Sequence, residues 1–147
     1  MRMSKRFLYG ATKVEETDGA QAPVASLETF RWKSRVLVIF ADRDNSRAAR
    51  QENQLLADRT GLGERDMVVL KISGSTVKSI FGAGGNLNEG ALRKELGAPE
   101  TGEFGAALVG KDGTVKLKVS EPVSNGELFA IIDSMPMRAA EALKPDK

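Results

Sequence analysis

Apolar residues follow two patterns along the chain, nearly unbroken runs and one alternating run. The unbroken runs cover Val36–Phe40, Met67–Ile72 and Phe104–Val109, and runs of this kind are typical of strands buried on both faces of a sheet. Residues 114–119, TVKLKV, alternate apolar side chains with lysine, which predicts a strand with one wet face. The Asp112-Gly113 pair just before it favours a hairpin turn. The chain therefore has four candidate strands, and the last two are joined as a hairpin.

Helix signals lie between these strands. Asn45 and Ser46 are both good N-caps, and a helix that begins there is expected to run to about Arg59, ahead of a pair of glycines. Residues 73–90 are rich in glycine, serine and asparagine, so they are expected to form a loop. A second, shorter helix is predicted over residues 88–96, because a glycine suited to end it follows directly.

The C-terminal part carries the clearest helix signal. Residues 124–127, SNGE, form a capping box, in which the serine hydroxyl and the glutamate carboxylate each satisfy a free backbone N–H. The apolar stripe that follows predicts a helix up to Met135. Pro136 breaks this helix or starts a new turn, and residues 137–143 predict a short helical tail.

The two ends of the chain set the expected domain bounds. Residues 1–25 are small and polar and show no period, so we expect a flexible N-terminal arm that can add an edge strand. Residues 26–143 are expected to form a single domain, and residues 144–147 a tail. Trp32, the only tryptophan, is expected to pack against the core, since large aromatic side chains are mostly buried.

The order of the elements predicts an α/β fold. A strand, a helix and a second strand imply a parallel pair with a crossover helix. A further helix, the strand hairpin and a closing helix complete the order. We therefore expect a thioredoxin-like architecture, a four-stranded mixed sheet flanked by helices on both faces.

The composition excludes several kinds of catalytic chemistry and points to none. The chain has no cysteine and no histidine, so thiolate nucleophiles, disulfides and imidazole bases are excluded. A catalyst built from this chain would need carboxylates, a lysine of shifted pKa, a hydroxyl or a metal held by oxygen. The net charge is only +2, which gives no argument for nucleic acid as a partner. No cofactor and no metal site is expected.

The N-terminus gives no sign of a membrane or export segment. The apolar patch after its basic residues is only Phe7–Tyr9, which is shorter than the roughly 7–15 apolar residues of a signal peptide. The chain as written is therefore expected in the cytoplasm, and as an exported protein if its N-terminus is processed or trimmed.

Five segments together resemble a known family. FRWKSRVLVIFA, ERDMVVLKISG, LRKEL, LVGKDGTVKLK and MPMRAAE look like a bacterial domain family of unknown function that is similar in fold to thioredoxin and peroxiredoxin. Related domains are found in sushi-repeat-containing extracellular proteins and in a coiled-coil-domain-containing matrix protein. The resemblance implies the fold and no particular activity.

The resemblance also points to a candidate site. Thioredoxin-like proteins carry their redox cysteines in the turn after the first core strand, at a helix N-terminus that stabilises a thiolate. The matching positions here are Asp42, Arg43, Asp44, Asn45 and Ser46. Those proteins also place a cis-proline before the third core strand. The matching place here is Glu103-Phe104-Gly105, with the nearest proline at Pro99. A trans bond is expected there because a non-proline cis bond costs roughly 3 kcal/mol.

Three interpretations of the turn stay open. In the first, Asn45 or Ser46 caps the helix and the two aspartates lie favourably near its positive end. In the second, the helix N-terminus and the nearby arginines at positions 43, 47 and 50 hold an anion. In the third, Asp42-x-Asp44-x-Ser46 resembles the nucleophile loop of haloacid-dehalogenase-type phosphatases, which implies a Mg²⁺-dependent phosphate-handling enzyme. The glycine-rich stretch at residues 82–86 resembles a phosphate loop only loosely, and a flexible loop is expected there.

Elimination favours a function without catalysis. The usual reactive groups of the fold are absent and no replacement set is complete, so no catalytic residue is assigned. We expect a domain without redox activity that binds a protein partner through the turn at residues 42–46, together with Phe104, or that acts as a structural module. A homo-oligomer is compatible with this expectation.

Overall fold

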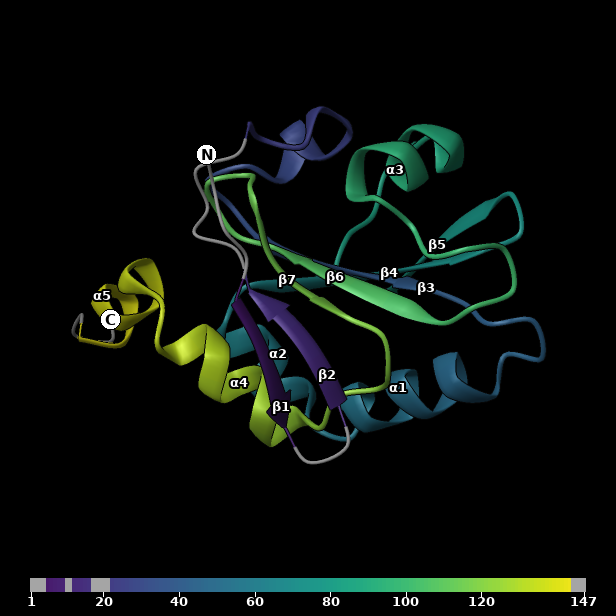
Figure 1. The fold of residues 1–147 in the computed structure, drawn as a ribbon. Coiled ribbons are helices and arrows are strands. Elements are labelled where there is room, and N and C mark those ends of the chain that lie inside the picture. Colours follow the sequence, from purple (N-terminus) through teal and green to yellow (C-terminus); the bar gives the residue numbers. More distant parts are fainter. Residues whose placement is uncertain (1–4, 10–11, 17–21, 144–147) are drawn as a thin grey trace.

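One mixed sheet forms the centre of the molecule (Figure 1). The computed structural model describes residues 5–9, 12–16 and 22–143. Its strand order is β1-β2-β7-β6-β3-β4-β5, with β3 and β4 parallel and every other neighbouring pair antiparallel. The strands are β1 (Lys5–Tyr9), β2 (Thr12–Glu16), β3 (Arg35–Phe40), β4 (Met67–Ser73), β5 (Thr76–Phe81), β6 (Gly105–Val109) and β7 (Val115–Val119).

The four expected strands are present and form the middle of the sheet. The parallel β3–β4 pair and the β6–β7 hairpin are both confirmed. The burial pattern of β7 is alternating, as the lysines predicted, whereas β3 and β6 are buried throughout. Physically, central strands bury both faces because helices cover the sheet on each side.

The sheet has three strands beyond the four that the apolar runs predicted. Strand β5 lies within the expected loop at residues 73–90, and it pairs with β4 through a tight turn at Gly74, which has a φ of 59°. Strands β1 and β2 form a hairpin that extends the sheet beyond β7. The expected arm of residues 1–25 therefore contributes two strands, while residues 1–4, 10–11 and 17–21 of that arm lie outside the described residues.

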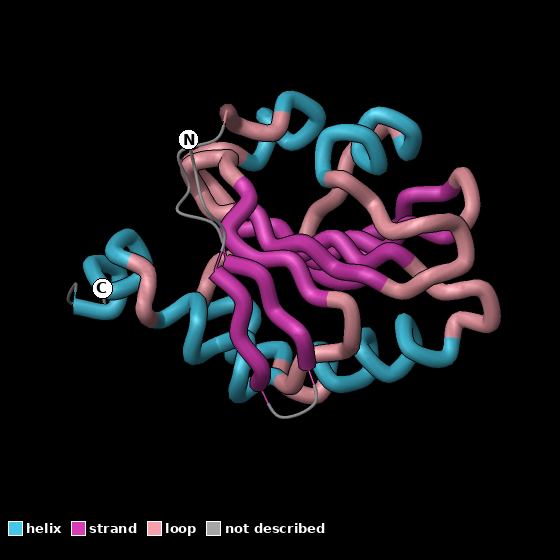
Figure 2. The backbone as a smooth tube through the Cα atoms, in the orientation of Figure 1, coloured by secondary structure: helices cyan, strands magenta, loops and turns pink. Residues whose placement is uncertain are grey.

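Helices cover both faces of the sheet (Figure 2). Helices α1, α2 and α4 lie on one face, and α3 and the short 3₁₀ helix η1 lie on the other (Figure 1). Each face encloses its own hydrophobic core, built around Leu55 and Ile132 on the first and around Leu27 and Leu92 on the second. The bounds are η1 (Ala25–Phe30), α1 (Ser46–Leu56), α2 (Arg59–Glu64), α3 (Glu89–Leu96), α4 (Asn125–Asp133) and α5 (Pro136–Leu143).

The helix that was expected to run from position 45 or 46 to about Arg59 ends earlier, and a second helix follows it. The Asp58 side chain caps α2 by accepting a hydrogen bond from the Gly61 N–H at 2.9 Å. Gly61 therefore lies inside a helix instead of ending one. A Cβ at this position would come within 2.6 Å of the Phe129 ring, so the glycine allows α2 and α4 to pack closely.

The prediction that Trp32 packs against the core is wrong. Its side chain is 59% exposed and its φ is 69°. Leu27 and Phe30 of η1 fill the core on this side of the sheet instead. The chain leaves η1 at Arg31, and the backbone reverses at the tryptophan before it enters β3.

Candidate functional site

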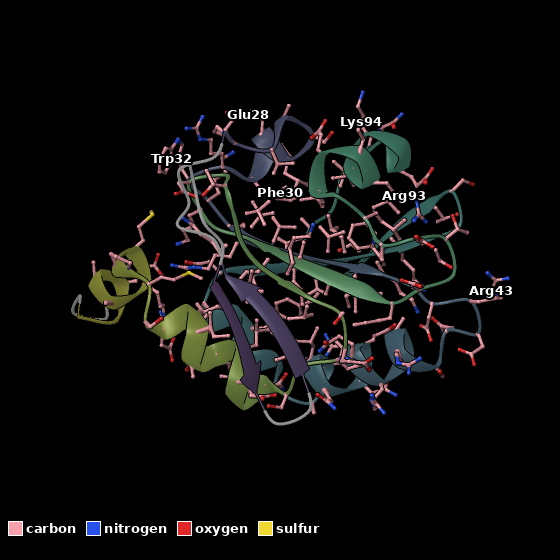
Figure 3. All side chains as sticks on the ribbon, in the orientation of Figure 1. Glu28, Phe30, Trp32, Arg43, Arg93 and Lys94 are labelled. Carbon is pink, nitrogen blue, oxygen red and sulfur yellow. The ribbon has the colours of Figure 1, made fainter. Side chains whose placement is uncertain are left out.

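The turn between β3 and α1 lies at the carboxyl ends of the parallel strands, where open α/β sheets commonly bind ligands. Figure 3 shows Arg43 of this turn and Trp32 at opposite ends of the molecule. Asp42, the first acidic residue of the turn, is buried. Its Oδ2 accepts hydrogen bonds from the Arg47 N–H at 3.0 Å and the Ser46 hydroxyl at 3.3 Å, and its Oδ1 accepts one from the Ala48 N–H at 3.0 Å.

These hydrogen bonds fix the charge state of Asp42. Burial alone would raise the pKa of this carboxyl, but the backbone N–H groups of Arg47 and Ala48 favour its ionised form more strongly and lower the pKa to about 2. The ionised carboxylate also lies at the positive end of the helix. Asp42 is therefore a permanent anion at neutral pH, bound to its own helix.

Side chains of the turn do cap α1, as the first interpretation expected. The capping residues, however, are not the expected Asn45 and Ser46. Asn45 adopts a left-handed backbone with a φ of 62°, and its side chain caps nothing. The Ser46 N–H donates to Asp44 Oδ1 at 3.1 Å. The two aspartates thus satisfy the free N–H groups that the asparagine and serine were expected to satisfy.

The structure does not offer the free helix N–H groups on which the anion-site interpretation depends. The N–H groups that would hold a ligand already bind Asp42 and Asp44. The three nearby arginines are also not assembled, because the Arg47 guanidinium pairs with Glu121 at 3.0 Å. The position in which the fold stabilises a thiolate is occupied by the chain's own carboxylate.

The geometry gives no support to the phosphatase interpretation. A nucleophilic aspartate needs a free oxygen, and both oxygens of Asp42 accept hydrogen bonds from the first turn of α1. Lys111, the nearest match to the required later lysine, pairs with Asp66 and Glu141, each at 2.7 Å. The described residues contain no group of three or more acidic side chains that could hold a metal ion.

A hollow of about 330 Å³ adjoins the turn and is lined by several polar side chains. The Arg43 N–H donates to the Gly102 carbonyl at 3.0 Å, and the Arg43 guanidinium lies over Gly102. A Cβ on that glycine would come within 2.5 Å of Arg43 Nη2. The hollow is lined by Ala41, Asp42, Arg43, Ser73, Gly74, Arg93, Thr101, Gly102 and Glu103.

Two arginines of the hollow differ in their partners. Arg93 of α3 is held by Glu89 and by the Gly74 carbonyl, the latter at 2.9 Å. The Arg43 guanidinium forms no hydrogen bond or ion pair with the described residues. Figure 3 shows Arg43 extending from its loop towards solvent. This guanidinium and the exposed Glu103 carboxylate are the charged groups of the hollow that have no partner among the described residues.

The sequence placed only part of this site correctly. Asp42 and Arg43 line the hollow, while Asp44, Asn45 and Ser46 shape the turn beside it. Phe104 is 4% exposed and belongs to the core, so it presents no surface to a ligand. Arg93 was missed because it comes from a helix 50 residues along the chain from Arg43. No local pattern connects the two.

The fold and the site define a thioredoxin-like domain that lacks cysteine. The chain belongs to the family described as a domain of unknown function, DUF4174, whose profile matches residues 26–141. The expected membership of a domain family of unknown function and the expected thioredoxin-like fold are confirmed.

Two further proteins are similar to the chain. Coiled-coil domain-containing protein 80 of Danio rerio is 32% identical over 135 residues, which cover 78% of the chain and 15% of that protein. The chain thus spans a small part of this relative. The crystal structure of reduced Plasmodium vivax 2-Cys peroxiredoxin matches with a TM-score of 0.50 and 18% identity, covering 78% of the chain and 84% of the peroxiredoxin chain. That likeness shows the fold alone. No helix among the described residues is long and apolar enough to cross a membrane.

Proposed function

We propose that this chain is a thioredoxin-like domain without redox activity that binds a protein partner at the turn of residues 42–46 and the adjoining hollow. The observation that carries the proposal is the contrast between two side chains of the turn. Asp42 is bound to its own helix, whereas the Arg43 guanidinium has no partner among the described residues. A rigid turn that presents one unpaired cation at the rim of a hollow suits recognition better than catalysis.

The rigidity of the turn supports the proposal. Hydrogen bonds tie the turn to α1 through Asp42, to residue 46 through Asp44, and to the 101–103 loop through the Arg43 N–H. A surface held in this way loses little conformational entropy when a partner binds. The absence of cysteine from the chain removes thiol peroxidase and thiol exchange chemistry.

The partner's side of the contact is expected to include a carboxylate. The Arg43 guanidinium can form a bidentate pair with such a group, and pairs of this kind are strong and directional. Asp42 does not compete for the guanidinium because its oxygens are already used. Arg93 also lines the hollow, but its guanidinium is already held by Glu89 and the Gly74 carbonyl.

A pull-down from native lysate tests the proposal. The bait is the full chain as wild type, as Arg43→Glu and as Arg50→Glu. Arg50 lies exposed on α1 and does not line the hollow, so the two variants make the same change in charge at different places. We expect a defined set of proteins to be lost with Arg43→Glu and kept with Arg50→Glu, as measured by quantitative mass spectrometry. Identical protein sets for all three baits would contradict the proposal.

A further inference from the structure

The end of the molecule opposite the turn carries an exposed tryptophan. Trp32 is 59% exposed, although tryptophan side chains are usually well buried. Its φ of 69° lies in the left-handed region, which bulky residues rarely adopt. Asparagine or glycine would occupy this position with less strain. The chain therefore maintains a large apolar ring in solvent on a strained backbone.

Contacts on both sides of the residue hold this conformation. The Trp32 N–H donates to the Lys111 carbonyl at 2.6 Å, and the Ser34 N–H donates to the Phe30 carbonyl at 2.9 Å. Arg31 Nε donates to the Asp112 carbonyl at 3.1 Å, and the Arg31 guanidinium lies 5.0 Å from the centre of the indole ring. Strain that surrounding contacts maintain in this way is typical of functional sites.

Lys111 also lines a cavity that has an apolar wall. Its volume is about 420 Å³, and Lys111 lines it together with Ile131, Met135 and Met137. Met137 is 41% exposed. Among the described residues, Met137 and Trp32 are the two large hydrophobic side chains that are exposed. Lys111 connects the two, because its carbonyl accepts the Trp32 N–H and the residue lines the same cavity as Met137. Tryptophan, methionine and arginine are the residue types enriched at protein interfaces.

Among the described residues near Trp32, the charge that has no partner is positive. Lys33 is exposed and forms no ion pair with the described residues. The carboxylate paired with Arg31 is that of the exposed Glu28, at 3.9 Å. The Asp112 carboxylate is occupied, because it pairs with Lys116 at 2.9 Å and accepts two hydrogen bonds from Thr114. Figure 3 shows Glu28, Phe30 and Trp32 together on η1 and the turn that follows it.

We propose that Trp32, Arg31, Lys33 and Met137, with the cavity beside Lys111, form a second protein-binding surface. Its occupant is a segment of a partner protein that presents an aromatic or aliphatic side chain next to carboxylates. The apolar side chain packs on the indole ring and in the cavity, and the carboxylates pair with Arg31 and Lys33. This surface is separate from the turn at residues 42–46 and goes beyond the function proposed for that turn.

A random peptide library displayed on phage provides the probe. The library is selected on the full wild-type chain, and the selected peptides are synthesised and titrated against wild type, Trp32→Ala and Arg43→Ala. Because Trp32 is the only tryptophan, its emission reports directly on binding to the wild type. Calorimetry gives the affinities for all three chains.

We expect the selected peptides to combine apolar residues with Asp or Glu and to shift the emission of Trp32 to shorter wavelength. Their affinity is expected to fall about tenfold or more with Trp32→Ala, as for an interface hot spot, and to stay nearly unchanged with Arg43→Ala. Peptides of another composition, equal binding to Trp32→Ala, or a selection without binders would overturn the proposal. Sedimentation that shows a dimer lost with Trp32→Ala would overturn it too, because a second copy would then occupy the surface. Failure here leaves the Arg43 pull-down unaffected, so the two proposals are tested separately.

Discussion

The two ends of the sheet differ in whether their notable side chains are bound within the chain or exposed to solvent. At the carboxyl ends of β3 and β4, a turn that sets up chemistry in related folds is closed by the chain's own Asp42. At the other end of β3, Trp32 stays exposed on a strained backbone, next to the buried side chain of Arg35. A shared fold therefore does not by itself locate a binding surface. Both of our proposals rest instead on groups that have no partner among the described residues or stay exposed, the Arg43 guanidinium and the Trp32 ring.

The largest effect is expected from the ion pairs that support the Trp32 end. The Arg35 side chain is 1% exposed and forms two hydrogen bonds with Glu141 of α5, at 3.1 and 3.2 Å. Glu141→Ala leaves this guanidinium without its charge partner, so we expect a loss of about 3 kcal/mol in the free energy of unfolding. Urea denaturation measures the loss.

Glu121→Ala is the matched control for that change. Glu121 also pairs with an arginine, but both side chains are exposed, and exposed pairs contribute about 0–1 kcal/mol. An equal loss of stability in the two variants would contradict the larger contribution expected of the buried Arg35–Glu141 pair.

The next effect concerns the opposite end of the sheet. Asp42→Asn removes the charge that binds the first turn of α1, so we expect a loss of about 2 kcal/mol in the free energy of unfolding. Asp44→Asn removes the charge from a single exposed hydrogen bond, which the amide oxygen can still accept from the Ser46 N–H, and is expected to cost less. Urea denaturation at neutral pH ranks the two variants. The reverse order would show that Asp42 is not the principal cap.

The pH dependence of stability gives a second test of the role of Asp42. The pKa of Asp42 is lowered to about 2 in the folded chain and lies near 3.9 in an unfolded chain. A depressed folded pKa contributes stability that is fully present above the unfolded value and is lost as the pH falls through the folded value. Between about pH 4 and pH 2, wild type is therefore expected to lose more stability than Asp42→Asn. Parallel curves for the two proteins would contradict this expectation.

The smallest effect has the opposite sign. Trp32→Gly removes the strain of a bulky residue at a φ of 69°, and we expect a gain of about 0.5–1 kcal/mol in the free energy of unfolding after the loss of the Arg31 contact. Trp32→Ala keeps a side chain at the strained position and serves as the control. A clear loss of stability in Trp32→Gly would mean that the ring has a structural role.

The fold could be predicted from the sequence because its signals are local and repeated. The runs at β3, β4 and β6, the alternation of β7 and the capping box of α4 each specify an element by period or by a short motif. Strand β5 was missed because it lies at a sheet edge, where burial is partial and the apolar pattern is weak. The β1–β2 hairpin was missed for lack of a period in the arm.

The site was harder to predict because its contacts are set by the tertiary structure. Both Asp42 and Asn45 are reasonable caps by type, and only the backbone path decides that the first reaches the helix N–H groups. The hollow combines Arg43 with Arg93 and Gly102, which come from three separate segments. The exposure of Trp32 follows from a single backbone angle that no composition rule reports.

The central claim is that the Asp42 carboxylate occupies the N-terminus of α1. Carbon-detected NMR titration of the Asp42 carboxyl, read together with the amide shifts of Arg47 and Ala48, tests it most directly. We expect a midpoint at about pH 2, with both amide shifts changing at that same midpoint as their hydrogen bonds weaken. A midpoint near 4, the ordinary value for a free aspartate, with amides that do not respond, would contradict it.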